Sequence, residues 1–371
     1  MPRLPQILLA LLPLAAHAAD LPPGVTQPLA LDPGPGNPRN SEGDFVRLKS
    51  GRVLFVYTHF TSGTADHAAA VLASRFSDDG GKTWSATDEV VVKQLGKQNV
   101  MSVSLLRLVD GRIAMFYLVK NSSADCRPFV QFSADEAKTW TEPKPCMPDP
   151  VYLVLNNNRV VQLTKGKPGR IVLPVARHDF TKKDPYRAVA LCYYSDDGGA
   201  TFTKGTGELE APPEGRSGLQ EPLVVELKDG SLTMLCRTDR GSQFRSTSAD
   251  GGVTWTPAEP TDIKSPLSPA SVARIPKTGD LLMVWNDHSA INPKLKGKRT
   301  PLTVAVSKDE GKTWTNRKTL YAEPTGWYCY TAIAFVDDRV LLGHVCGTYT
   351  GGATGLARSA VTAFDVDWLY K

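Results

Sequence analysis

Six polar residues are the candidates for chemistry in this sequence of 371 residues. Three are arginines, whose guanidinium groups bind carboxylates through charge-assisted and often bidentate hydrogen bonds. The others are two carboxylic acids and a tyrosine, which can exchange protons with a substrate or attack it. The set is Arg39, Asp66, Glu221, Arg237, Arg299 and Tyr330. Because these residues are spread along most of the chain, the fold must return to one place repeatedly to bring them together.

A short repeat indicates which fold does this. The pattern S-x-D-x-G-x-T-W occurs five times with small departures, at steps of 53 to 62 residues. The Asp side chain can accept backbone N–H groups within its own turn, and the Gly supplies a positive φ. The aromatic residue can then pack the turn onto its sheet. The copies begin at Ser77, Ser133, Ser195, Ser248 and Ser307.

A second repeated pattern indicates six repeat units rather than five. A turn followed by an apolar strand recurs, as in S-G-R-V-L-F-V-Y and T-G-D-L-L-M-V-W. Its second turn residues are Gly51, Gly111, Gly169, Gly230, Gly279 and Asp338. Short strands at regular spacing are typical of all-β folds, and a long period repeated six times favours one propeller blade per repeat. The sequence therefore predicts an all-β, six-bladed β-propeller with four-stranded antiparallel blades and Asp-box turns.

Strand order predicts where the six candidates lie. In each blade, strand A precedes the Gly turn, strand B follows it, strand C runs into the S-x-D-x-G turn, and strand D leaves it. Antiparallel strands alternate in direction, so both kinds of turn share one face. The B–C loops and the starts of the A strands share the other face, where all six candidates fall. The sixth blade lacks an Asp turn, and residues 20–36 or Ala360–Phe364 are expected to complete it.

The turn repeat resembles the Asp box of sialidases, and the resemblance covers nearly the whole chain after residue 18. Sialidases carry three arginines that clamp the substrate carboxylate, an Asp acid/base on a loop of the first blade, and a Tyr–Glu nucleophile pair. Asp66-His67 precedes the first box much as the family's acid does. The Phe/Tyr-Arg-Ile-Pro motif of the first family arginine is absent, and Arg39 lies slightly early for that position.

The later motifs are more similar to the family. Glu221 and Arg237 are separated by about one hairpin, as in sialidases. The segment R-T-P-L-T from Arg299 precedes the fifth box, as the third family arginine does. The segment Y-T-A-I from Tyr330 resembles the Tyr-Ser-x-Leu of the nucleophile.

The resemblance implies an exo-acting, retaining glycoside hydrolase that removes a terminal acidic sugar, such as sialic acid, from glycans. The sugar's own carboxylate would repel a carboxylate nucleophile, so a neutral phenol suits this reaction. Tyr330 would attack, and Glu221, within hydrogen-bond reach, would take its proton. Asp66 would protonate the leaving oxygen and then activate water. The carboxylate clamp would consist of Arg39, Arg237 and Arg299.

Several alternatives stay open at this point. Tyr328 and Glu42 are the nearest rivals for the roles of their neighbours. The substrate could be another nonulosonic acid or a uronate. A propeller that only binds glycans would need the arginines but not the Tyr330–Glu221 pair. No cofactor is expected, and no histidine pair has the spacing of a metal site.

The N-terminus predicts an exported protein. Residues 1–18 combine Arg3, an apolar run and Ala16-His17-Ala18, which is typical of a signal peptide. The propeller is then residues 19–371, and the location is secreted or periplasmic. No later stretch is long and apolar enough to span a membrane. The formal charge of +5 is diffuse, without a basic run interleaved with aromatics, so a nucleic-acid partner is not expected.

Six cysteines in an exported chain permit disulfides. Cys329 and Cys346 flank a predicted turn at nearly equal distances and would face each other on a hairpin. Cys126 and Cys146 flank another turn. Each pair could form a bridge or remain as buried thiols.

Overall fold

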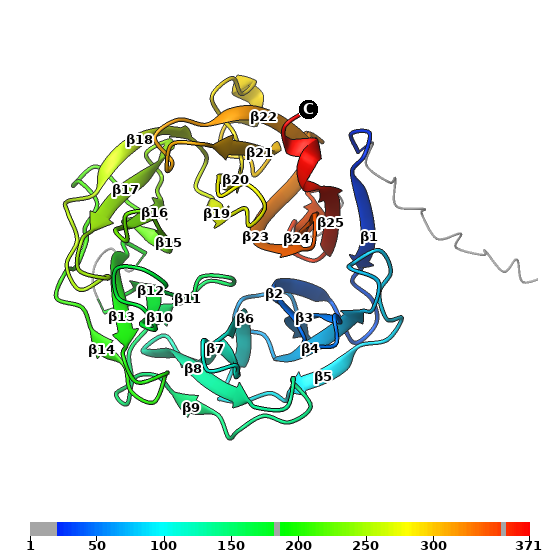
Figure 1. Ribbon diagram of the computed structural model, residues 1–371. Helices are drawn as coiled ribbons and strands as arrows, with labels where there is room; N and C mark the ends of the chain where they lie inside the picture. The colour runs from blue at the N-terminus through cyan, green and yellow to red at the C-terminus, as the bar shows by residue number, and fades with distance from the viewer. Residues whose placement is uncertain (1–20, 182–185, 350–353) are drawn as a thin grey trace, which may run out of the picture.

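The protein is an all-β, six-bladed propeller, as predicted. Its computed structural model describes residues 21–181, 186–349 and 354–371. Six antiparallel sheets are arranged in a ring around a central axis (Figure 1). The predicted signal peptide, residues 1–18, lies outside the described residues. Within the described ranges, no helix has the length and apolar character needed to cross a bilayer.

The first five blades follow one another along the chain. Blade 1 contains β2 (Arg39–Arg47), β3 (Val53–Phe60), β4 (Ala70–Ser77) and β5 (Glu89–Val92). Blade 2 contains β6 (Asn99–Arg107), β7 (Ile113–Ser122), β8 (Asp125–Ser133) and β9 (Lys144–Pro145). Blade 3 contains β10 (Leu153–Val154), β11 (Val161–Gln162), β12 (Ile171–Arg177), β13 (Val189–Ser195) and β14 (Thr203–Lys204). Blade 4 contains β15 (Gln220–Glu226), β16 (Leu232–Arg237), β17 (Ser242–Ser248) and β18 (Glu259–Lys264). Blade 5 contains β19 (Ser271–Arg274), β20 (Leu281–Trp285), β21 (Leu302–Ser307) and β22 (Thr315–Tyr321).

Both candidate segments complete the sixth blade. Its sheet has the order β1 (Thr26–Leu31), β25 (Ser359–Asp365), β24 (Arg339–Thr348) and β23 (Gly326–Val336). The N-terminal β1 pairs with the C-terminal β25, with Leu29 opposite Val361 and Leu31 opposite Ser359. The two chain ends therefore close the ring together, where the sequence had offered them as alternatives.

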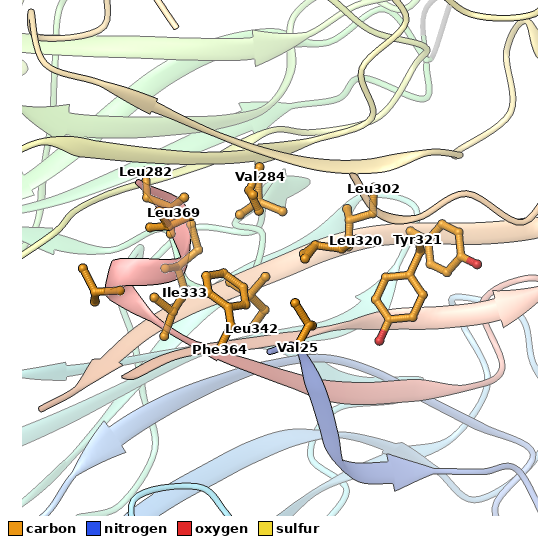
Figure 2. Close-up of a cluster of buried hydrophobic side chains, with 14 of the residues drawn as sticks. Val25, Leu282, Val284, Leu302, Leu320, Tyr321, Ile333, Leu342, Phe364 and Leu369 are labelled. Carbon is orange, nitrogen blue, oxygen red and sulfur yellow. The ribbon is translucent and has the colours of Figure 1, made fainter. Parts of the chain in front are cut away.

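The core lies between neighbouring blades. Six clusters of buried apolar residues occupy the six interfaces, and Figure 2 shows the one between blades 5 and 6. There, Leu282 and Val284 of β20 lie opposite Ile333, Leu342 and Phe364 of blade 6. The aromatic residues of the five Asp boxes each pack against a different one of the other clusters: Trp84, Trp140, Phe202, Trp255 and Trp314. At five of the six interfaces, a box aromatic thus packs one blade against its neighbour.

The Asp-box turns have one geometry, and the register places them on one face. In every copy, the box serine pairs with the residue that begins the second strand of its blade, as Ser77 does with Val53. In the first copy, the Asp79 carboxylate accepts Thr83 N at 2.9 Å and Thr83 Oγ1 at 2.6 Å. Ser77 Oγ accepts Gly81 N at 2.8 Å. The serine therefore has its own structural role in the turn.

The inner strand of blade 3 is interrupted. Both β10 and β11 pair with β12, but the chain leaves the sheet between Val154, which lies opposite Ala176, and Val161, which lies opposite Val172. Four hydrophilic residues fill this gap and contact other blades: Asn156, Asn157, Asn158 and Arg159. Arg159 reaches blade 5 at Ala270 O (2.8 Å) and Ser271 Oγ (3.2 Å), and Asn158 N donates to Val103 O of blade 2 at 3.0 Å. Residues 156–159, called the asparagine segment, therefore connect the inner strands of different blades across the axis.

The cysteines are buried thiols rather than disulfides. On the β23–β24 hairpin, Cys329 lies opposite Val345, whereas Cys346 lies opposite Tyr328. The two side chains are therefore one register position apart, because a β-bulge between Cys329 and Ala332 shifts the register by one, although the turn is centred on Asp337 and Asp338 as the sequence predicted. Cys126 and Cys146 are both buried in the interface between blades 2 and 3, also as free thiols.

Candidate active site

The inner strands of four blades share one irregularity, and two candidate residues occupy it. In each of β2, β6, β15 and β23, three residue steps oppose two steps on the neighbouring strand, which is a β-bulge. The first unpaired residue has a positive φ in all four strands: Glu42 at 44°, Ser102 at 60°, Glu221 at 45° and Tyr330 at 57°. Strained, non-glycine positions of this kind are concentrated at functional sites. Four blades thus each carry one side chain at the same position of the same β-bulge.

Arg39 and Asp66 form an ion pair within blade 1. Arg39 is the first residue of β2, and its Nη1 lies 2.6 Å from Asp66 Oδ1 and 2.9 Å from Thr64 O. The arginine side chain is 1% exposed, whereas that of Asp66, on the loop between β3 and β4, is 63% exposed. Partial desolvation raises the pKa of Asp66, but the charge and hydrogen bond of Arg39 outweigh it, and the pKa lies below its ordinary value. The candidate acid is therefore held ionised by a candidate clamp arginine.

Glu221 and Arg237 form the equivalent pair in blade 4. Arg237 Nη1 donates to Glu221 Oε2 at 2.7 Å. Its Nε and Nη2 both donate to Gln220 Oε1, at 2.9 and 2.6 Å. Gln220 was missed from the sequence, although its place beside Glu221 at the start of the inner strand was the available signal. These bonds fix the Arg237 guanidinium and engage one carboxylate oxygen of Glu221.

Arg299 differs from the other two arginines because none of the described carboxylates forms an ion pair with its guanidinium, which interacts instead with Tyr330 and Cys329. It precedes β21, is 8% exposed, and has no hydrogen-bond partner at Nε or Nη1 among the described residues. His288 Nε2 contacts the carbonyl oxygens of Lys298 and Thr300 on either side, and Tyr328 N donates to Arg299 O. The backbone of Arg299 is thus held while its charge is available.

Tyr330 lies beside this guanidinium. Arg299 Cζ is 5.1 Å from the Tyr330 ring centroid and 5.3 Å from that of Trp327. Burial and the charge of Glu221 raise the pKa of Tyr330, and the opposing effects of Arg299 and Arg237 do not cancel this rise. In the structure desolvation dominates, so the phenol is neutral and needs a base to attack.

The predicted bond between Tyr330 and Glu221 is not formed in the described structure. The two side chains interact through charge, while Glu221 is bonded to Arg237 instead. Glu221 also interacts electrostatically with Arg299, and both Arg39 and Arg299 lower the pKa of Asp66. All six candidates therefore belong to one electrostatically connected group.

The rival tyrosine lies elsewhere. Tyr328 is buried in the cluster between blades 5 and 6, stacked on Tyr321 with ring centroids 4.9 Å apart. The other rival, Glu42, does belong to the site: its carboxylate accepts Ser102 Oγ at 2.9 Å and interacts with Arg39, Asp66 and Glu221.

Two further residues were missed. Lys120, at the end of β7, places its Nζ 3.4 Å from Asp66 O. Asn157, in the asparagine segment, donates from Nδ2 to Tyr330 O at 3.0 Å and to Gly43 O at 2.8 Å. Three consecutive asparagines, residues 156–158, upstream of the third Gly turn were the available signal for this second position. Asn157 supports the backbone of Tyr330 and that of blade 1 together.

Comparison with known proteins agrees with this architecture. The BNR repeat-like domain model matches residues 56–343. The chain is 25% identical over 390 residues to a sialidase of Micromonospora viridifaciens, covering 91% of this chain and 58% of that protein. It is 27% identical over 254 residues to an anhydrosialidase of Macrobdella decora, covering 62% of this chain and 31% of the relative. The chain thus spans about a third to three-fifths of the length of these curated relatives.

The structural comparison gives the same fold. The sialidase of Trypanosoma rangeli, solved as a covalent intermediate with 2,3-difluorosialic acid, superposes with a TM-score of 0.69 at 16% identity. The match covers 94% of this chain and 60% of that one. At this identity the likeness concerns the fold alone, but the family model covers most of the chain. The protein therefore belongs to the BNR repeat-like domain family within the sialidase superfamily.

Proposed function

We propose that the protein is an exo-acting, retaining glycoside hydrolase that removes a terminal acidic sugar, sialic acid or a close relative, from glycans. The observation that carries the proposal is Arg299. A buried guanidinium with unpartnered N–H groups is costly unless an anion binds it. Here it lies beside a tyrosine on a strained bulge and interacts with Glu221.

Arg39 and Arg237 would complete a carboxylate clamp with Arg299. Both are already paired with carboxylates, Asp66 and Glu221. An incoming sugar carboxylate would compete with those partners, because the same guanidinium groups would have to serve both anions. Substrate binding would thus loosen the bonds that engage the two acids before the reaction begins.

This exchange would have a chemical consequence for Asp66. Arg39 holds the pKa of Asp66 below its ordinary value in the free protein, so Asp66 is then a poor proton donor. A bound sugar carboxylate would offset the charge of Arg39 and raise that pKa. Asp66, on an exposed loop, would become a better acid when a substrate is present.

In the first step, the Tyr330 oxygen would form a bond to the anomeric carbon while its proton passes to Glu221. The bond from that carbon to the leaving sugar would break, and Asp66 would donate its proton to the departing oxygen. In the second step, Asp66 would take a proton from water, and the water oxygen would displace Tyr330. Glu221 would then return the proton to the phenolate, leaving the enzyme unchanged.

The decisive experiment is covalent trapping with a 2,3-difluorinated acidic sugar, the kind of ligand in the Trypanosoma rangeli complex. We expect the protein to gain the mass of one sugar, located on the peptide that contains Tyr330, and to lose activity on fluorogenic acidic glycosides. The Tyr330→Phe variant should not be labelled. A protein that binds the acidic sugar but neither cleaves glycosides nor becomes labelled would be a glycan-binding propeller instead.

A further inference from the structure

The bulge of the inner strands occurs in two more blades than the proposed reaction uses. Blades 4 and 6 present Glu221 and Tyr330 from it, whereas blades 1 and 2 present Glu42 and Ser102. These two residues contact each other, because Ser102 Oγ donates to Glu42 Oε2 at 2.9 Å. The site therefore contains a second pair, Glu42 and Ser102, which occupies the same bulge position as Glu221 and Tyr330.

The surroundings of Glu42 are unlike those of the other acids. The residue is buried, at 6% exposure, yet none of the described arginines or lysines forms an ion pair with it. Its Oε2 accepts Ser102, while Oε1 accepts no hydrogen bond from the described residues. Buried carboxyl groups normally have their hydrogen-bonding capacity satisfied. One oxygen of Glu42 is thus available to a ligand held by the neighbouring Arg39.

We propose that Glu42, positioned by Ser102, determines substrate specificity by bonding a hydroxyl or amide group of the acidic sugar, on the side of the site formed by blades 1 and 2. This proposal rests on the proposed function, because it assumes that the sugar carboxylate binds the arginines. It predicts a preference for sugars with a neutral polar substituent at that position over sugars with a second anionic group there.

The charge of Glu42 explains the expected preference against sugars with a second anionic group. Burial raises the pKa of Glu42 to about 7, and the charges of Asp66 and Glu221 add to this rise against the lowering effect of Arg39. A group that changes between neutral and negative near neutral pH can bond an N–H or O–H group in either state. It would repel an additional sulfate or phosphate whenever it is ionised.

The test measures binding, so that it does not depend on turnover. The ligands are an unsaturated analogue of sialic acid, its single-deoxy derivatives and a sulfated derivative, titrated calorimetrically. The proteins are the wild type, Glu42→Gln, Glu42→Ala and Ser102→Ala. Glu136→Gln, at an Asp box on the opposite face, is the control for a changed glutamate outside the site.

We expect one deoxy derivative to bind the wild type about tenfold to a hundredfold more weakly than the parent ligand, the usual cost of leaving a buried polar group unpaired. In Glu42→Ala, that same deoxy derivative and the parent should bind within about twofold of each other. The penalties for the other hydroxyls should be the same in both proteins. In Glu42→Gln, the difference in affinity between the parent and the sulfated ligand should be smaller than in the wild type. In Ser102→Ala, the affinity penalty of the critical deoxy derivative should be reduced but not abolished.

The outcomes separate the two proposals. If every deoxygenation costs the same in wild type and Glu42→Ala, the specificity role is wrong even when the wild type cleaves acidic glycosides. If one penalty disappears in Glu42→Ala but the wild type cleaves nothing, the specificity role stands and the hydrolase proposal fails. If no acidic sugar binds, both are wrong.

Measuring ligand affinity over a pH series adds a test, because a purely structural role of Glu42 would not change the pH dependence of binding. Ionisation of Glu42 places a negative charge beside an anionic ligand, so wild-type affinity should fall as the pH rises through about 7. This fall should be absent in Glu42→Gln. The charged or titratable groups that interact with Glu42 are Arg39, Asp66, Glu221, Cys126 and Cys329. Since all five remain in the variant, the difference between the two curves isolates Glu42.

Discussion

The two faces of the propeller use carboxylates in opposite ways. On the Asp-box face, each box aspartate is surrounded by N–H and O–H donors of its own turn, and these donors lower its pKa, to about 2 for Asp135, Asp197 and Asp309. On the opposite face, Glu42 is buried, Ser102 is its one hydrogen-bond donor among the described residues, and its pKa is raised to about 7. The first arrangement stabilises a turn, whereas the second retains a group that can respond to a ligand.

The same contrast holds for repetition. The five Asp boxes repeat both their backbone and their side chains, and each aromatic residue fills an equivalent position between blades. The inner-strand bulge repeats its backbone four times but carries four different side chains: Glu42, Ser102, Glu221 and Tyr330. Repetition of both indicates architecture, and repetition of the backbone with varied side chains indicates a site.

The strongest test of this contrast is Tyr330→Phe. The change removes only the attacking oxygen, so kcat on an active acidic glycoside should fall by about 10³-fold or more. Calorimetric binding of an unsaturated acidic sugar should change little. Tyr328→Phe is the matched control, because Tyr328 packs between blades 5 and 6 and should keep turnover within a few-fold of the wild type. Wild-type turnover in Tyr330→Phe would refute the nucleophile assignment.

The next largest effect is expected at Arg299. Removing the guanidinium in Arg299→Gln should lower kcat/KM about 10²-fold, and Arg299→Lys should recover only part of this loss, since lysine lacks the bidentate geometry. Arg317→Gln is the control: this arginine of β22 pairs with Asp287 and is 43% exposed. Equal losses in both variants would show that general charge, rather than a clamp, attracts the substrate.

The repeat made most of the fold predictable. Five boxes and six turns between the first and second strands, five with Gly and one with Asp338, predicted the blade number and the shared face, because these turns need specific residues at fixed spacing. Closure by both chain ends was not resolved, since β1 and β25 are each short strands without a turn signal of their own. The interruption of the third inner strand was missed because its role depends on contacts with blades 1, 2, 5 and 6.

The grouping of the six candidate residues was predictable, but the bonds between them were not. Strand order placed Arg39, Asp66 and Glu221 at one end of their blades, and the structure shows them in one connected group. Sequence could not show that Arg237 would engage Glu221 in place of Tyr330. Nor could it show the equivalence of Glu42 and Tyr330, which depends on backbone φ and register rather than on residue type.

Stability at alkaline pH gives a third test, on Glu42. A folded-state pKa of about 7, above the ordinary 4.5, means that ionising this group costs stability above pH 7 and costs nothing below about pH 4. Glu42→Gln should therefore increase the free energy of unfolding at pH 8.5 by roughly 1–3 kcal/mol, and should give no gain at pH 4. Denaturant unfolding at the two pH values checks this. Equal effects at both would mean that titration of Glu42 is not the cause.

A smaller effect on activity is expected for Asn157→Ala. The change removes the bonds to Tyr330 O and Gly43 O, so the strained backbone of Tyr330 loses support. We expect kcat to fall about tenfold with KM nearly unchanged, together with a lower melting temperature. Asn286→Ala is a matched control, because Asn286 is equally buried and donates to Tyr328 O and Pro301 O. It should lose similar stability but less kcat; equal losses in kcat would reduce Asn157 to a general packing role.

The smallest effect is expected on the Asp-box face, from Asp197→Ala. Asp197 accepts Ser195 Oγ at 2.7 Å and Thr201 N at 2.9 Å, and these donors, with Thr201 Oγ1, lower its pKa to about 2. A lowered folded-state pKa contributes stability above the ordinary value of 3.8 and loses it as the pH falls towards 2. The melting temperature of the variant should therefore be lower by a few degrees at pH 7, with a difference that shrinks on acidification.

The control is Asp149→Ala, which removes an exposed carboxylate in the loop after β9 and should show neither effect. Kinetic constants should be unchanged in both variants, because the box lies on the face opposite the site. A selective loss of kcat in Asp197→Ala would mean that the two faces are coupled, and that the Asp-box turns are not purely structural.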